Sequence, residues 1–204
     1  MCPGVISRPL PVRNGARPLD HSITTFDHVR LPSESLLGAP TPTPNLRTDF
    51  LAQIWRVSVG TLSLSLLNIP VLRQSAYIVG TYSARRRVSS NVGNRTVPII
   101  GFATQYRPVL TALVQASALD AFADDAIEAF RDDTLSVEVR HAVATCFKAT
   151  ITMATQTTLA ELTDRCGWQG LFAHNRIIEA AQFVKGNGIA EGDYTVLCIR
   201  KSNR

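Results

Sequence analysis

Two carboxylates flank a glycine at Glu191, Gly192 and Asp193, and an apolar stretch follows them in the sequence. Asp193 or Glu191 can cap the N-terminus of a helix there, where the helix dipole also favours a negative charge. A carboxylate next to a glycine is also a good position for a general base, because the glycine lets the backbone approach a flat ligand. The pattern alone leaves helix capping and proton abstraction both open.

Two other patterns are candidates for ligand binding. Gly167 and Gly170 follow the end of a predicted helix, so their backbone N–H groups can face a ligand, although a helix end and a turn explain them as well. Arg85, Arg86 and Arg87 end an earlier predicted helix. They can satisfy the last helix carbonyls, or they can clamp a pyrophosphate, for which the guanidinium geometry is well suited.

The composition is that of an ordinary folded protein with a mild positive charge. Apolar residues make up 45% and charged residues 18%, and the net charge is +5. This charge can attract a phosphorylated small molecule, but no aromatic residues interleave with a long basic stripe, so we expect no nucleic-acid partner. The four cysteines form no C-x-x-C pair and have no histidine at zinc spacing, which predicts mostly buried, reduced thiols and no metal site.

Two further features bear on location. The first residues lack the apolar core of a secretory signal, and we find no apolar run of about 18 residues that could span a membrane. We therefore expect an intracellular protein that is not secreted and that has no membrane partner.

Residues 1–45 differ in composition from the rest of the chain. They contain eight of the eleven prolines, and residues 22–30 are β-branched and aromatic with partial alternation, which predicts a strand. One or two strands do not fold alone. We therefore predict that residues 1–45 are the remnant of a β-domain, made of strands and a proline-rich linker.

From residue 46 onward the apolar periodicity is helical. Helices are predicted over residues 46–88, 100–130, 136–166 and 176–184, with a last helix that starts at Glu191 or Asp193. Asn45 or Thr48 can cap the first of these helices, Pro70 should kink it, and Ser136 can cap the third.

The remaining segments connect these helices. Residues 89–98 predict a loop, and the glycines within residues 185–188 predict a helix end. Long helices joined by short connections predict a mainly α protein, an up-and-down four-helix bundle over residues 46–204 preceded by the short β and irregular segment.

Taken in order, these segments resemble the acyl-CoA dehydrogenase and oxidase superfamily. Residues 20–38 (DHSITTFDHVRLPSESLLG) are similar to the family's exit from its β-domain, and residues 82–90 (YSARRRVSS) to the oxidases' arginine motif. Residues 104–107 (TQYR), 165–170 (RCGWQG) and 190–196 (AEGDYTV) resemble the TQQ, CGGHG and EGDNTV motifs. The last match is the most specific and favours the oxidase branch. The resemblance covers nearly the whole chain, as the end of the β-domain plus the C-terminal helical bundle.

The resemblance implies a chemistry: FAD-dependent α,β-desaturation of an acyl thioester, with molecular oxygen as the electron acceptor. In the family, a glutamate at the position of Glu191 removes the α-proton, and the β-hydride passes to the flavin. The other matching positions would contact the cofactor: Gly192 and Asp193 on the flavin side, Arg86 at the pyrophosphate and often across a dimer interface, Gln105 on the second helix, and Gly167 and Gly170 near the adenine.

Departures from the family pattern leave another function open. Trp168 stands where the family has a second glycine, and residues 88–90 (VSS) stand where it has a Gln-Phe-Gly-type group. Full-length members also carry an N-terminal helical domain and a complete β-domain. We therefore expect a homo-oligomer or a complementary chain that supplies those domains, in the cytoplasm or the peroxisome. The alternative is a non-catalytic helical assembly or binding subunit that has lost flavin chemistry.

Overall fold

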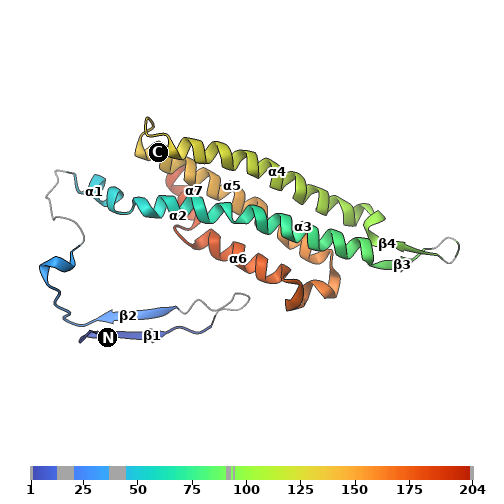
Figure 1. Cartoon of the computed structure of the whole chain (residues 1–204), viewed down its shortest axis with the longest axis horizontal. Coiled ribbons are helices and arrows are strands. Elements are labelled where there is room, and N and C mark those ends of the chain that lie inside the picture. Colours follow the sequence, from blue (N-terminus) through green and yellow to red (C-terminus); the bar gives the residue numbers. More distant parts are fainter. Residues whose placement is uncertain (1, 13–20, 37–44, 91–92, 94, 203–204) are drawn as a thin grey trace. The chain divides into compact units, whose positions relative to one another are not determined.

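The computed structural model of the chain describes all residues except 1, 13–20, 37–44, 91–92, 94 and 203–204. The chain forms two compact units, Met1–Gln53 and Ile54–Arg204. Figure 1 shows a strand hairpin in the first unit and a bundle of long helices in the second. The assignment of residues 1–45 to a former β-domain stays a prediction.

The first unit contains a two-stranded antiparallel hairpin. Strand β1 (Val5–Pro9) pairs with strand β2 (Ser22–Phe26), with Val5 opposite Phe26. Strand β2 confirms the strand predicted within residues 22–30. Nearly all residues of both strands are exposed, and two strands alone are marginally stable in water.

The other elements described in the first unit are a 3₁₀ helix, η1 (Ser33–Ser35), and helix α1 (Leu46–Gln53). Asn45 Oδ1 accepts a hydrogen bond from the backbone N–H of Arg47 at 3.1 Å, so Asn45 supplies the predicted cap of α1.

The second unit is helical. Its described helices are α2 (Trp55–Leu66), α3 (Asn68–Arg85), α4 (Ala103–Arg131), α5 (Val137–Asp164), α6 (Ile177–Ile189) and α7 (Tyr194–Ser202). Short 3₁₀ turns lie at η2 (Ile99–Gly101), η3 (Gly167–Leu171) and η4 (Ala173–Asn175). Helix α5 is central, because it packs against α2, α3, α4, α6 and α7. The predicted mainly α fold with a helical bundle is confirmed (Figure 1).

Small residues let α4 pack closely on its neighbours. Apart from Pro108, its buried positions follow alternating steps of three and four residues, which keeps them on one face of the helix. They are Val109, Ala112, Ala116, Leu119, Ala123, Ala126 and Phe130. Four of these seven are alanines, so the facing side chains of α3 and α5, such as Leu72 and Phe147, fill the space.

Pro70 breaks the long helix that the sequence predicts over residues 46–88. A proline has no N–H, and its ring collides with the carbonyl of the residue four positions earlier, here Leu66. Helix α2 ends at Leu66 and α3 begins at Asn68. The predicted kink is therefore present, one turn before the proline, and a second break at Ile54 separates α1 from α2.

A second proline, Pro108, lies inside α4 and frees the carbonyl of Thr104. That carbonyl accepts a hydrogen bond from Arg165 Nη1 at 3.2 Å. The arginine that follows α5 therefore replaces the backbone hydrogen bond that the proline removes, at an exposed position of α4.

The predicted loop over residues 89–98 is wrong in part, because its two ends belong to a second hairpin, which begins at Arg87 and ends at Pro98. Strand β3 (Arg87–Ser89) pairs antiparallel with β4 (Thr96–Pro98). Arg87 holds the two strands together by donating to the Thr96 hydroxyl at 3.0 Å and to the Thr96 carbonyl at 2.7 Å. This cross-strand contact is invisible in the local turn pattern.

The predicted helix end at residues 185–188 is also wrong. Helix α6 continues through Gly186 and Gly188 to Ile189. A Cβ at Gly188 would lie 3.0 Å from Thr152 Cγ2 of α5. Gly188 therefore permits a close approach of two helices and does not end one.

Burial of the cysteines also differs from the prediction. Cys166 is buried, whereas Cys2, Cys146 and Cys198 are exposed, and all four are free thiols. Burial raises the pKa of the Cys166 thiol. Within the described residues, no group of three or more His, Cys, Asp or Glu side chains is placed to hold a metal ion.

The stretch Trp55–Arg85, which comprises α2 and α3, is long and apolar enough to cross a membrane by length and composition, since an 18-residue window in it has a mean hydropathy of 1.2. The prediction that the chain has no such run is therefore wrong. The core helix of a bundle passes the same test, and Leu72, Ala76 and Val79 of this stretch are buried against the other helices.

Candidate functional site

The Glu191–Gly192 turn joins α6 to α7 in a left-handed backbone conformation. Glu191 has a φ of 54° and Gly192 a φ of 103°. Glycine adopts a positive φ without strain, but a positive φ is unfavourable for a glutamate and persists only where surrounding contacts enforce it.

Buried side chains hold three successive carbonyls of this turn. Lys148 Nζ of α5 donates to the carbonyl of Ala190 and, at 2.5 Å, to the carbonyl of Gly192. Thr61 Oγ1 of α2 donates to the carbonyl of Glu191 between them at 2.9 Å. The turn is therefore fixed to two long helices through its backbone, which leaves the Glu191 side chain available for other contacts.

Lys148 is fully buried, with 0% of its surface exposed. Burial lowers the pKa of its ammonium group, and the nearby Asp193 and Glu191 carboxylates partly oppose that effect. Lys148 was not among the residues predicted from the sequence. Its signal was a lysine on the apolar face of α5, between Ala144 and Ile151, which are both buried.

The carboxylate of Glu191 lies against α2. A Cβ at Gly60 would be 2.8 Å from Glu191 Cδ, so the absence of a side chain at Gly60 makes room for the carboxyl group. Arg56 Nη1 lies 3.8 Å from Glu191 Oε1. The Glu191 side chain is 25% exposed and that of Arg56 87%, so the pair is weak and the carboxylate can be reached from solvent.

Asp193 is the capping residue of the two carboxylates. Its Oδ1 accepts hydrogen bonds from the backbone N–H groups of Thr195 at 2.8 Å and Val196 at 3.2 Å, in the first turn of α7. Within the described residues, the Glu191 carboxylate accepts no such hydrogen bond from α7. Capping therefore explains Asp193 and leaves Glu191 to be explained.

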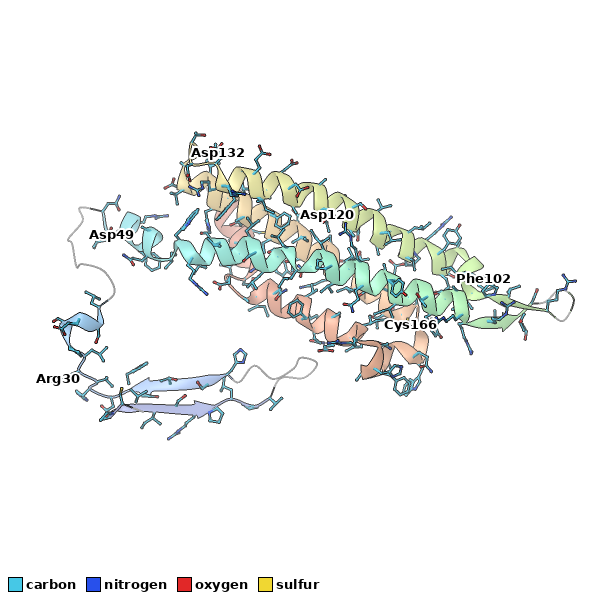
Figure 2. All side chains as sticks on the ribbon, in the orientation of Figure 1. Arg30, Asp49, Phe102, Asp120, Asp132 and Cys166 are labelled. Atoms are coloured by element: carbon cyan, nitrogen blue, oxygen red, sulfur yellow. The ribbon has the colours of Figure 1, made fainter. Side chains whose placement is uncertain are left out.

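The other predicted cofactor residues gather at the far end of the bundle. Lys148 and Arg165 are separated by 17 positions along α5 and its end, which corresponds to about 25 Å. Gln105 lies at the Arg165 end, where its Nε2 donates to the Arg165 carbonyl at 3.0 Å. Figure 2 shows Phe102 and Cys166 close together at this end and Asp132 at the opposite end of α4. The structure thus forms two separate groups from the predicted residues.

Arg86 caps α3 at the same end, and its carbonyl accepts a hydrogen bond from the Ile99 N–H at 2.9 Å. Its side chain is exposed, and across the part of the chain that the structure describes the guanidinium has no hydrogen-bond or ion-pair partner. An open guanidinium at this position fits the pyrophosphate of a dinucleotide.

The glycine turn fits a ligand less closely. Gly170 is buried, and a Cβ there would lie 2.6 Å from the Thr163 carbonyl oxygen, so packing alone explains this glycine. Gly167 has a φ of 53° and open space around it. Trp168 is 72% exposed, and its ring meets that of Phe172 edge to face at 6.2 Å. Gly167 is thus the one of the two predicted glycines that leaves room for a ligand.

The chain belongs to the acyl-CoA oxidase family. Its residues 62–203 match the family model described as the acyl-CoA oxidase C-alpha1 domain. A curated relative, the peroxisomal acyl-coenzyme A oxidase 3 of Homo sapiens, is 27% identical over 98% of this chain, which spans 32% of that relative. The resemblance found in the sequence is confirmed.

Solved structures show the same fold. An acyl-CoA oxidase-1 of Caenorhabditis elegans, complexed with FAD and ATP, superposes with a TM-score of 0.82 at 17% identity over 97% of this chain and 31% of its own. A tomato acyl-CoA oxidase gives a TM-score of 0.78 at 22% identity over 99% of this chain and 34% of its own. The butyryl-CoA dehydrogenase of Megasphaera elsdenii gives 0.75 at 14% identity over 97% of this chain and 47% of its own. The chain therefore spans about a third of the length of the oxidases.

Proposed function

We propose that this chain contributes the catalytic base and part of the cofactor site to an enzyme that performs FAD-dependent α,β-desaturation of an acyl thioester. The family assignment supports acyl-CoA oxidation in general. The observation that carries the proposal is the Glu191 turn, in which a strained backbone is held by Lys148 and Thr61 while the carboxylate stays reachable.

Glu191 is the proposed base. Its carboxylate accepts the α-proton of the thioester, because a carboxylate of fixed position and partial burial is suited to general-base catalysis. When bound, FAD supplies the acceptor for the β-hydride and the stabilisation of the developing enolate. Asp193, which is committed to capping α7, keeps the turn in place from its other side.

Arg86, Gln105 and Gly167 are the proposed contacts of the cofactor's pyrophosphate and adenine end, together with Gly170 as the residue that lets the turn pack. They lie about 25 Å along α5 from Lys148 and the Glu191 turn. The Glu191 turn and the residues around Arg86 in one chain therefore need not contact the same cofactor molecule. This separation supports a homo-oligomer in which Arg86 reaches the cofactor of a neighbouring copy.

The remaining walls of the site would come from sequence outside this chain, as a longer product or a complementary chain with N-terminal helical and β-domains. The coverage of 32% of the human relative supports this need. Molecular oxygen is the proposed acceptor, in line with the oxidase family model. The peroxisomal name of the human relative supports an intracellular location, in the peroxisome or the cytoplasm.

Reconstitution tests this function. The chain would be purified alone and with the N-terminal and β-domains of an acyl-CoA oxidase, and the visible flavin spectrum and acyl-CoA oxidation would be recorded. Flavin retention and turnover only in the combination support the proposal. A combination that assembles but never retains flavin would contradict it.

A second candidate is a helical binding subunit without flavin chemistry. Trp168 favours it, because a large exposed ring stands where the family resemblance has a glycine. The two candidates are separated by Trp168→Gly in the same reconstitution. If the wild-type chain assembles without flavin and Trp168→Gly restores flavin binding, the chain is the binding subunit.

A further inference from the structure

Lys148 is an unusual residue for the centre of a bundle. The chain has three lysines, Lys148, Lys185 and Lys201, and Lys148 lies on the central helix α5 with none of its surface exposed. A buried ammonium loses its hydration, and an apolar side chain of similar volume is often as stabilising or more so. Its retention at this position therefore needs a reason other than packing.

The contacts of Lys148 supply that reason. An ammonium group has three donors, and two of them are used by the carbonyls of Ala190 and Gly192. These carbonyls belong to the residues immediately before and after Glu191. A single side chain therefore fixes both ends of the peptide segment that carries Glu191.

This clamp acts on a backbone that would otherwise relax. The φ of 54° at Glu191 is unfavourable for a residue with a side chain, so the turn needs external contacts to persist. Thr61 supplies one, to the Glu191 carbonyl. Without Lys148 the two flanking carbonyls would have no protein donor that the described contacts show, and the segment could rotate away from Gly60.

Two carboxylate side chains near Lys148 have a charge effect that favours its ammonium form. Glu191 and Asp193 both lie close enough to favour the ammonium form of Lys148. Arg56, the cation near Glu191, is mostly exposed. The attraction between the buried ammonium group and these two carboxylates thus acts in the same direction as the hydrogen bonds from Lys148 to the turn.

We propose that Lys148 is the positioning residue of the Glu191 turn: it clamps the carbonyls on both sides of Glu191 and thereby sets where the carboxylate lies above Gly60. Its importance for catalysis rests on the proposed function of Glu191 as a base. The clamp itself is a property of the chain and can be tested without flavin or substrate.

Hydrogen exchange on the full 204-residue chain tests the clamp. Lys148→Met keeps an unbranched apolar side chain and removes the donors. We expect the amides of residues 190–197, including Ala190 and Leu197, which are hydrogen-bonded in the wild type, to exchange at least about tenfold faster, as for the loss of one charged hydrogen bond. Residues 109–126 of α4 should keep their protection.

Thr155→Val is the matched control. Thr155 is buried on the same helix, and its hydroxyl is without a partner in the described part of the protein, so the change disturbs the same face without removing a clamp. In the Thr155→Val variant, the amides of residues 190–197 should exchange as in the wild type. Equal acceleration of the turn by Thr155→Val, uniform acceleration along the whole bundle by Lys148→Met, or no acceleration at all would each overturn the proposal.

A second measurement keeps the test valid if Lys148→Met does not fold. Amine acetylation of the native wild-type chain, followed by peptide mass spectrometry, compares Lys148 with the exposed Lys185. A clamped ammonium should react at least about a hundredfold more slowly, since it must first leave both carbonyls. Reaction of Lys148 at the rate of Lys185 would refute the clamp.

The outcome is separable from that of the proposed function. Glu191→Gln keeps the backbone carbonyls and should leave exchange of residues 190–197 unchanged, while it removes the base. If the exchange results hold but Glu191→Gln is fully active in a reconstituted enzyme, the clamp stands and the proposed function fails. If the exchange results fail, Lys148 is a core residue whatever the activity.

Discussion

The two ends of the bundle are built by opposite means. At the Glu191 end, side chains of α2 and α5 bind the connecting turn through its backbone, and the carboxylates of Asp193 and Glu191 lie near enough to favour the charged form of Lys148. At the Arg86 end, the contacts are between helix termini, and the Arg86 guanidinium reaches solvent without a partner in the described residues.

The difference shows which part of a site a chain can complete by itself. The Glu191 turn has its geometry already enforced, as catalysis by a positioned base requires. The Arg86 end provides charge but little enclosure, so a ligand there must be held partly by something else. Changes at the first end should therefore affect position and turnover, and changes at the second should affect binding.

The largest effect should come from Glu191→Gln in the reconstituted enzyme. The amide keeps the size of the side chain but cannot accept the α-proton, so kcat should fall about 10²- to 10⁴-fold. Steady-state kinetics measure this, and the thermal midpoint should stay that of the wild type. Unchanged turnover would remove Glu191 from the mechanism.

Gly60→Ala should act through position alone. The new Cβ would lie 2.8 Å from Glu191 Cδ, and the carboxylate is flexible enough to move aside. We expect turnover to fall by about tenfold to a hundredfold with no loss of stability, because alanine favours the helix. Gly80→Ala is the control: its Cβ would meet Val109 Cγ1 at an ordinary 3.5 Å, so it should gain about 0.5–1 kcal/mol and keep full turnover.

Gly170→Ala, at the Arg86 end of the bundle, should lower the free energy of unfolding. Its Cβ would lie 2.6 Å from the Thr163 carbonyl oxygen, which is backbone and cannot easily move. We expect a loss of about 1–3 kcal/mol in urea denaturation. Gly101→Ala, where the Cβ would meet nothing within 4 Å, should be close to neutral. Equal stability of the two variants would argue against the packing account of Gly170.

Arg86→Gln should weaken flavin binding by about tenfold and leave stability unchanged, because its side chain is exposed and its guanidinium makes no hydrogen bond or ion pair within the described residues. Flavin titration of the reconstituted enzyme provides the measurement. Arg87→Gln should instead lower stability and leave flavin binding unchanged, since Arg87 donates hydrogen bonds to Thr96 across the hairpin. A flavin affinity that falls only in Arg87→Gln would reassign the anion site.

The smallest effect should be a pH dependence at Lys148. Burial lowers its pKa from the ordinary value of 10.5, so in the alkaline range up to 10.5 the unfolded chain binds more protons than the folded chain. Wild-type stability should therefore rise with pH relative to Lys148→Met. The raised pKa of Cys166 has the opposite sign but is common to both proteins and cancels in the difference. Urea midpoints of both proteins across this range measure it, and a falling difference would contradict the assigned direction.

Local signals predicted much of the fold. Asn45 and Ser136 cap their helices as their side chains suggest, and Ser136 Oγ accepts from the Val139 N–H at 3.3 Å. Pro70 marks a break because its effect is confined to one turn of helix. Gly188 misled the prediction, because its reason is the proximity of α5, which depends on packing between distant segments.

The candidate site, like the fold, could be predicted only where its signal is local in the sequence. The sequence pattern identifies Glu191 and Asp193, but only the structure shows that Asp193 caps α7 and that Glu191 does not. Lys148 and Gly60 lie 43 and 131 residues before Glu191, so no local spacing connects them to it. A lysine on the buried face of α5 was the one available signal, and it gave no indication of what it binds.

The hydrogen bond between Arg165 and the carbonyl freed by Pro108 has a consequence for alignment. Thr104 and Gln105 are neighbours on α4, and both are tied to Arg165, one through its guanidinium and one through its carbonyl. A shift of α4 along α5 by one helical turn, about 5.4 Å, would break both hydrogen bonds. The proline thus creates, through the carbonyl that it frees, a contact that favours the observed axial position of α4 on α5.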